Sequence, residues 1–170
     1  LVRARGLGDV DKRRHWTCIA AGEARGRVDS PEAVDFCERW FGFNDELQYR
    51  EGETPWRVEG GYGAGPVIVP RLTPVGSRTE AFINTYLLMK HHGHDTTEVR
   101  ALIERGLGQL LRWRWAPGPT HLLADPVGAH GGMPGSPVDL SCRNDFVQHG
   151  GSAWIRWADV LRQEAAEDPL

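Results

Sequence analysis

The sequence has little lysine, little net charge and no long apolar run. Lys12 and Lys90 are its only lysines among 20 basic residues, and with 21 glycines and 11 prolines this bias indicates a GC-rich genome, so we give the arginines no functional weight. The apolar runs fall far short of the ~18 residues that a membrane span requires, which predicts a soluble protein without a membrane span. A net charge of −3 gives no electrostatic reason to expect a nucleic-acid partner.

Cysteine is also scarce. Cys18, Cys37 and Cys142 are odd in number and widely spaced, and no C-x-x-C pair occurs among them. We therefore expect free or buried thiols rather than a disulfide scaffold, which slightly favours a cytoplasmic location. With 170 residues, 40% of them hydrophobic, we expect a single domain over 1–170. Because the first residue is Leu1, we expect that the natural start can lie upstream.

Helical periodicity marks five segments of the chain. Ser30 before Pro31 predicts a helix start, because serine can accept free backbone N–H groups and proline loses no hydrogen bond there. Ser77 and Glu80 form a capping box, and Asp95 stands as an N-cap before the clearest amphipathic pattern. The expected helices lie around 11–22, 31–41, 77–93, 95–111 and 145–164.

Two long connections rich in glycine and proline separate these helices, at 42–76 and 116–144. Loops of this length in a compact domain are usually functional or disordered. Gly-Gly-Tyr at 60–62 and Gly-Gly-Met at 131–133 are 71 residues apart, and prolines and a helix start follow each. This similarity predicts a helix pair used twice, with an incomplete copy at each end. We expect no strand, because 67–69 is short and enclosed by prolines.

The segment 103–111, Ile-Glu-Arg-Gly-Leu-Gly-Gln-Leu-Leu, resembles the outer helix of the repeat in terpenoid cyclases and protein prenyltransferase β-subunits. In that repeat a Gly-Gly loop and an inner helix follow, as they do here at 131–135 and from about 143. The resemblance covers about 77–161 and implies an all-α fold of helical-hairpin repeats of α/α-toroid type, whose inner-helix N-termini line a central cavity. Five helices cannot close a ring of six pairs. We therefore expect an incomplete ring: a fragment that lacks N-terminal repeats, a partial toroid or half of a homo-oligomer.

The sequence departs from this family where metal and acid motifs are expected. The Asp-rich motif of squalene-type cyclases is missing, and no cysteine lies near 79–81, where the resemblance places the first zinc ligands of prenyltransferases. Asp145-Phe146 followed by His149 is similar to the later prenyltransferase ligand motif, with one extra residue. A zinc site could be formed by Asp139, Cys142 and His149, together with His130. These are permitted ligand types, but their spacing matches no strong ligand pattern. We assign no metal site.

Three residues are the candidates for acid–base chemistry. Asp145 and His149 are separated by i, i+4, so the carboxylate could orient the imidazole while the imidazole moves a proton. Glu80, at the start of an inner helix in the repeat interpretation, would face the same cavity as a second carboxylate. Each also has a structural interpretation. Asp145 would be an N-cap, His149 a hydrogen-bonded histidine within a helix interface, and Glu80 a capping-box residue.

Four residues are predicted to contact a ligand. Trp56 and Tyr62 lie in the first glycine-rich loop, where aromatic faces can line a sugar or isoprenoid pocket, although core packing is the alternative. Arg78 stands beside Glu80. His130 precedes Gly-Gly as in the oxyanion loops of serine hydrolases, but no Gly-x-Ser-x-Gly accompanies it.

The sequence thus predicts an enzyme or enzyme fragment of α/α-toroid type with a small-molecule cavity, for an isoprenoid-like or carbohydrate ligand, that uses His149 and Asp145 in acid–base chemistry. The alternative is a non-catalytic helical-repeat module that binds a protein, since a partial ring exposes apolar edges. A third interpretation is a sugar-active toroid with Glu80 or Asp145 as the acid.

Overall fold

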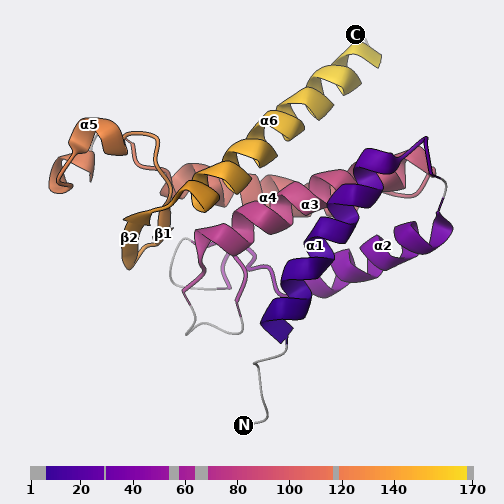
Figure 1. Ribbon diagram of the computed structural model, residues 1–170, viewed down its shortest axis with the longest axis horizontal. Helices are drawn as coiled ribbons and strands as arrows, with labels where there is room; N and C mark the ends of the chain where they lie inside the picture. The colour runs from indigo at the N-terminus through magenta and orange to yellow at the C-terminus, as the bar shows by residue number, and fades with distance from the viewer. Residues whose placement is uncertain (1–6, 29, 54–57, 64–68, 117–118, 168–170) are drawn as a thin grey trace.

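A bundle of α-helices dominates the computed structural model, which describes residues 7–28, 30–53, 58–63, 69–116 and 119–167 (Figure 1). This confirms the expectation of a mostly helical fold. No helix within these residues is long and apolar enough to cross a membrane. In chain order the elements are α1 (Leu7–Ala24), α2 (Pro31–Asp45), α3 (Leu72–His91), α4 (Thr97–Trp113), the 3₁₀ helix η1 (Pro119–Leu122), α5 (Pro126–Ala129), β1 (Pro134–Ser136), β2 (Asp139–Cys142) and α6 (Asn144–Glu167).

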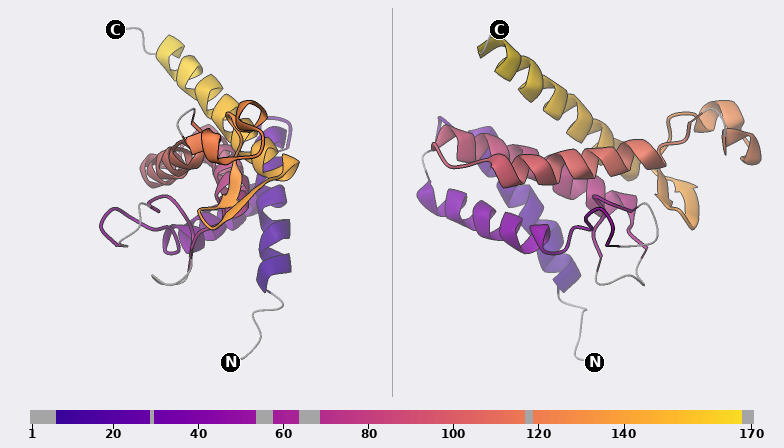
Figure 2. Two further views of the ribbon diagram at one scale, coloured as in Figure 1. Left: turned by 90° about the vertical axis from the view of Figure 1, so that its left-hand side faces the viewer. Right: turned by 180° about the vertical axis from the view of Figure 1, so that it is seen from behind.

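Helix α3 forms the centre of the bundle, and α1, α2, α4 and α6 all pack against it (Figures 1 and 2). Every residue from 79 to 86 is buried. Glycines bring the neighbouring helices close: a Cβ at Gly22 of α1 would lie 2.6 Å from Cβ of Asn84, and one at Gly106 of α4 would lie 2.4 Å from Oγ1 of Thr79. Small residues therefore allow α1 and α4 to approach the buried helix closely.

Alternate long helices run in the same direction. Contacts advance together along α3 and α6, from Gly76 against Gly150 to Lys90 against Glu164, so these two helices are parallel. Helix α1 also runs parallel to α3, whereas α2 and α4 run the opposite way (Figures 1 and 2). The N-terminal halves of α1, α3 and α6 consequently lie at the same end of the bundle.

The two glycine-rich loops are held by the same pair of backbone hydrogen bonds. The N–H of Tyr49 donates to the carbonyl of Gly61 at 2.8 Å, and the Tyr49 carbonyl accepts from the N–H of Gly60 at 2.9 Å. Gly60 and Gly131, the first glycines of the two loops, have φ values of +86° and +84°. The second loop repeats both bonds at 2.9 Å through Trp115, Gly132 and Gly131.

The helix boundaries confirm one sequence-predicted cap and correct another. Ser30 Oγ accepts from the N–H of Ala33 at 3.3 Å, with Pro31 as the first helical residue. The capping box of Ser77 and Glu80 is wrong, because α3 begins at Leu72 and both residues lie inside it. Proline at position 74 is tolerated in the first turn, where its missing N–H would have no intrahelical partner.

A small hairpin corrects the expectation that the chain has no strand. β1 and β2 pair antiparallel, with Pro134 opposite Cys142 and Ser136 opposite Asp139. Ser136 Oγ accepts from the N–H of Val138 at 3.2 Å and of Asp139 at 3.0 Å, which closes the turn. Strands of three and four residues interrupted by proline show no alternating pattern in the sequence. Residues 67 and 68 of the weak strand pattern lie outside the described residues.

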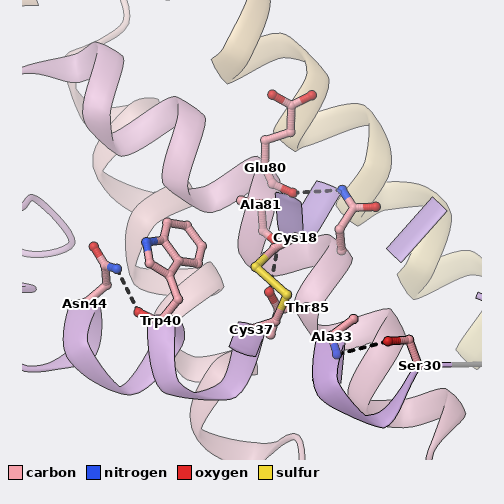
Figure 3. Close-up of a disulfide and its surroundings, with 10 residues drawn as sticks. Cys18, Ser30, Ala33, Cys37, Trp40, Asn44, Glu80, Ala81 and Thr85 are labelled. Atoms are coloured by element: carbon pink, nitrogen blue, oxygen red, sulfur yellow. Dashed lines mark hydrogen bonds between the residues drawn. A yellow bond between two sulfur atoms is a disulfide. The ribbon is translucent and has the colours of Figure 1, made fainter. Parts of the chain in front are cut away.

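The cysteine pairing also differs from the expectation of free thiols. Cys18 of α1 and Cys37 of α2 form a disulfide, and both are fully buried (Figure 3). Cys142 is free and exposed. Spacing alone did not reveal the bond, because the two cysteines are 19 positions apart in the sequence and come together only when α1 and α2 pack side by side.

We expect removal of this disulfide to lower the free energy of unfolding by about 3 kcal/mol. The bond links residues 19 positions apart and so restricts the unfolded chain. Urea unfolding of the Cys18→Ser, Cys37→Ser double variant measures the loss. Cys142→Ser is the matched control and should leave the urea midpoint unchanged. Equal midpoints for the double variant and the wild type would show that the bond contributes nothing to stability.

A cluster of charges anchors the C-terminal half of α6. Glu164 accepts hydrogen bonds from Tyr86, Lys90 and Arg100, the last at 2.8 Å. Burial opposes ionisation of Glu164, but these bonds and the cationic neighbours outweigh it and lower the pKa of Glu164 to about 2. The carboxylate thus ties α6 to both α3 and α4.

Candidate functional site

A buried carboxylate on α3 binds two side chains of α6. Glu80 Oε2 accepts from Nδ1 of His149 at 2.9 Å, and Glu80 Oε1 accepts from the hydroxyl of Ser152 at 2.5 Å. The side chains of Glu80 and His149 are only 7% and 12% exposed. The parallel packing of α3 and α6 brings these residues together, because Gly76 and Gly150 let the two backbones approach.

Arg156 extends this cluster toward the surface. Its Nε lies 3.3 Å from Ser152 Oγ and 3.8 Å from Glu80 Oε1, and its Nη1 pairs with Glu23 of α1. The Arg156 side chain is 36% exposed. Two carboxylates from different helices therefore bracket one arginine beside the histidine.

The surroundings of Glu80 keep it ionised. Burial raises its pKa, but the hydrogen bonds from His149 and Ser152 and the electrostatic attraction of His149 and Arg156 outweigh burial, so the pKa of Glu80 lies below its ordinary value of 4.5. An ionised carboxylate can only accept hydrogen bonds, so in the hydrogen bond between His149 and Glu80 the proton is on Nδ1 of His149.

Two aromatic side chains of α1 cover the imidazole. The ring centroids of Trp16 and His149 are 6.1 Å apart, and those of His15 and His149 are 6.2 Å apart. Trp16 is 52% exposed, whereas His15 is buried. The indole is therefore the solvent-facing wall beside His149, contributed by the third helix that starts at this end of the bundle.

This arrangement has the parts of an acid–base site. Glu80 fixes the ring orientation and the tautomer of His149, which leaves Nε2 as the nitrogen that can accept a proton. Within the described residues, Nε2 of His149 has no hydrogen-bond partner. A carboxylate that accepts from the imidazole also stabilises the imidazolium formed by proton transfer.

The structure brings together two of the three predicted catalytic residues. Glu80 and His149 are in contact, but Asp145 accepts from Nε of Arg143 at 3.0 Å and forms no hydrogen bond with His149. The expectation that Asp145 orients His149 is therefore wrong. The i, i+4 spacing places Asp145 and His149 on adjacent turns of α6. However, the Nδ1 of His149 donates to Glu80, a carboxylate from another helix.

The predicted ligand-binding residues do not gather at this site. Tyr62 is buried in the core, where its ring lies 6.4 Å from that of Phe82 and its hydroxyl accepts from Gln48. Burial raises the pKa of Tyr62, so its phenol stays neutral. The Arg78 guanidinium lies 4.8 Å from the Tyr62 ring centroid. His130 is exposed after α5, and Trp56 lies outside the described residues.

The candidate zinc ligands lie in separate environments. Asp139 accepts from the N–H and hydroxyl of Ser141, Cys142 is exposed on β2, and His149 is bound to Glu80. Among the described residues, no group of three or more His, Cys, Asp or Glu side chains could hold a metal ion.

The sequence interpretation missed several members of the cluster. Ser152 and Arg156 follow His149 at i+3 and i+7, so helical spacing alone places all three on one face of α6. That spacing could have found them. Trp16 and Glu23 had no such signal, because only the packing of α1 against α3 and α6 brings them near His149.

Comparison of the chain with protein-family models, with curated proteins and with solved structures finds no match. The function is therefore argued from the site and the fold.

Proposed function

We propose that the chain is an enzyme, or part of one, of α/α-toroid type, in which His149 acts as a general acid/base on a small isoprenoid-like or carbohydrate molecule. The observation that carries the proposal is the hydrogen bond from Nδ1 of His149, whose side chain is 12% exposed, to the ionised Glu80. A buried carboxylate that orients a histidine is a recurrent device for proton transfer.

The arrangement of the helices supports the toroid part of the proposal. In stacked helix pairs the inner helices run parallel and the outer helices run the opposite way, as α1, α3, α6 and α2, α4 do here. The repeated hydrogen bonds at Gly60 and Gly131 support a unit that is used twice. The cluster combines side chains from all three parallel helices, α1, α3 and α6, and Glu80 and His149 lie in the N-terminal halves of theirs, which is where the resemblance implies the cavity.

The residues divide the work as follows. His149 takes or gives the proton through Nε2, and Glu80 holds the ring and stabilises its charged form. Ser152 and Arg156 hold the carboxylate of Glu80 in place. Trp16 presents an indole face on which an apolar chain or the C–H face of a sugar ring can lie.

Activity measurements on the purified chain, with panels of prenyl diphosphates and oligosaccharides, test this proposal. For each compound that the wild type converts, we expect His149→Ala to lower kcat by about 100-fold or more. Arg162→Gln, at an exposed arginine of the same helix paired with Asp159, is the matched control and should retain the wild-type rate. Equal rates and affinities in His149→Ala, or no conversion of any compound by the wild type, would contradict the proposal.

A non-catalytic interaction module is the second candidate, favoured by apolar side chains on the outside of the bundle. Val147 and Ile155 of α6 are 42% and 67% exposed, and Val138 and Leu140 at the hairpin are 80% and 53% exposed. Such side chains suit a protein interface. Sedimentation of the chain with and without Ile155→Glu distinguishes this candidate: a self-associating wild type that the variant disrupts favours it.

A further inference from the structure

A hollow lies between α1 and α2, and none of the described residues that line it belongs to the His149 cluster. Its lining is formed by Arg14 of α1 and by Phe36, Arg39, Trp40 and Phe43 of α2, and it encloses about 170 Å³. The buried disulfide lies near the hollow, because Cys18 follows Arg14 by about one helical turn and Cys37 precedes Trp40 by nearly one turn. Figure 3 shows the disulfide and Trp40. The bond therefore fixes the spacing of the two helices that form the walls.

The floor and one wall of the hollow are apolar. Trp40 is 3% exposed, and its ring packs at 4.7 Å from that of Phe82 in the core, which holds the indole in place. Phe36 is half-buried, and Phe43 is 49% exposed at the rim. An aromatic ring left half in water at the rim of a hollow gains stability when an apolar group covers it.

The opposite wall carries an uncompensated positive charge. Arg14 is half-buried and forms no hydrogen bond or ion pair with any other described residue, whereas Arg39 at the rim pairs with Asp35. None of the described residues that line the hollow is acidic. A guanidinium partly removed from water and without a partner favours a carboxylate, which it can bind through two parallel hydrogen bonds.

Size limits the ligand further. Pockets for drug-sized molecules enclose roughly 300–1,000 Å³, so a hollow of about 170 Å³ accommodates one ring or one branched chain. We infer that this hollow binds a small carboxylate with a single apolar ring or branched chain, its carboxylate on Arg14 and its apolar part between Trp40 and Phe43. This site is separate from the His149 cluster and does not depend on the proposed function.

Calorimetry on the full oxidised chain tests the inference with 3-phenylpropionate and its neutral analogue 3-phenylpropionamide. We expect the carboxylate to bind at least about tenfold more tightly than the amide, because only the carboxylate can pair with a guanidinium. Arg14→Gln should lower the affinity for the carboxylate to that for the amide and leave the affinity for the amide unchanged. Arg14→Lys should give an intermediate affinity, because lysine keeps the charge but not the paired geometry.

Two further variants make the result specific. Phe43→Ala should weaken both compounds, and Arg162→Gln, at an exposed arginine on α6, should weaken neither. Equal affinity for carboxylate and amide, unchanged binding in Arg14→Gln, or no binding at millimolar concentration would overturn the inference. A dimer in sedimentation that Phe43→Ala dissociates would also overturn it, because a second copy of the chain would then cover the hollow.

Discussion

Glu80→Ala is expected to lower the free energy of unfolding by about 3–5 kcal/mol at neutral pH, because it leaves His149, Ser152 and Arg156 without the buried carboxylate that binds them. Urea unfolding followed by circular dichroism measures the loss. Glu80→Gln keeps the size and one acceptor oxygen, so it should fold even if the alanine variant does not, with about half of the loss.

The pH dependence of this loss identifies its cause. The pKa of Glu80 is lower in the folded chain than its ordinary value of 4.5, so its ionisation stabilises the fold above that pH. The contribution is lost as the pH falls through the folded-state value, and the difference between wild type and Glu80→Gln should shrink below about pH 4.5.

Glu104→Ala serves as the control for Glu80. Glu104 is 52% exposed and pairs with Arg100 on the same helix, so its removal should cost less than about 0.5 kcal/mol. A loss below about 1 kcal/mol in Glu80→Ala would show that the carboxylate does not hold α3 and α6 together.

Gly60→Ala is expected to destabilise the chain by about 3 kcal/mol or more, through strain at positive φ and overlap with a neighbouring helix. Gly60 has a φ of +86°, and a Cβ there would lie 2.0 Å from the carbonyl oxygen of Arg105 in α4. The loop would have to move, which would break the bond from Nε2 of Gln48 to the Gly60 carbonyl. Denaturant midpoints measure the effect.

The second glycine loop supplies the matched control for this change. Gly131 has almost the same φ, +84°, but a Cβ there would meet no atom within 4 Å. Gly131→Ala should therefore cost only the backbone strain, about 1–2 kcal/mol. Equal losses at the two positions would show that close packing against α4 is not what requires glycine at position 60.

Much of the fold followed from local patterns. The helix start at Ser30 and Pro31, the antiparallel pair of α3 and α4 and the similarity of the two glycine loops each depend on residues close in sequence or on one repeated segment. The start of α3 was predicted five residues too late, because Ser77 and Glu80 satisfy a capping pattern while tertiary packing extends the helix back to Leu72.

The candidate site was predicted in part, because residue types and helical spacing are also local features of the sequence. His149 and Glu80 were chosen as residue types able to exchange protons, and α6 carries His149, Ser152 and Arg156 on one face. The sequence did not show that Glu80 and His149 are hydrogen-bonded to each other, since they are 69 residues apart. Which carboxylate lies nearest His149 depends on how α3 packs against α6.

The sequence by itself determined the helices, the two glycine loops and a histidine and a glutamate suited to acid–base chemistry, because periodicity, caps and residue types are local properties. Only the tertiary structure decided that Glu80 rather than Asp145 holds His149, that Cys18 pairs with Cys37, and that Tyr62 is buried in the core. These outcomes depend on how α1, α2, α3, α6 and the first glycine-rich loop pack together, and contacts between distant segments leave no trace in local spacing.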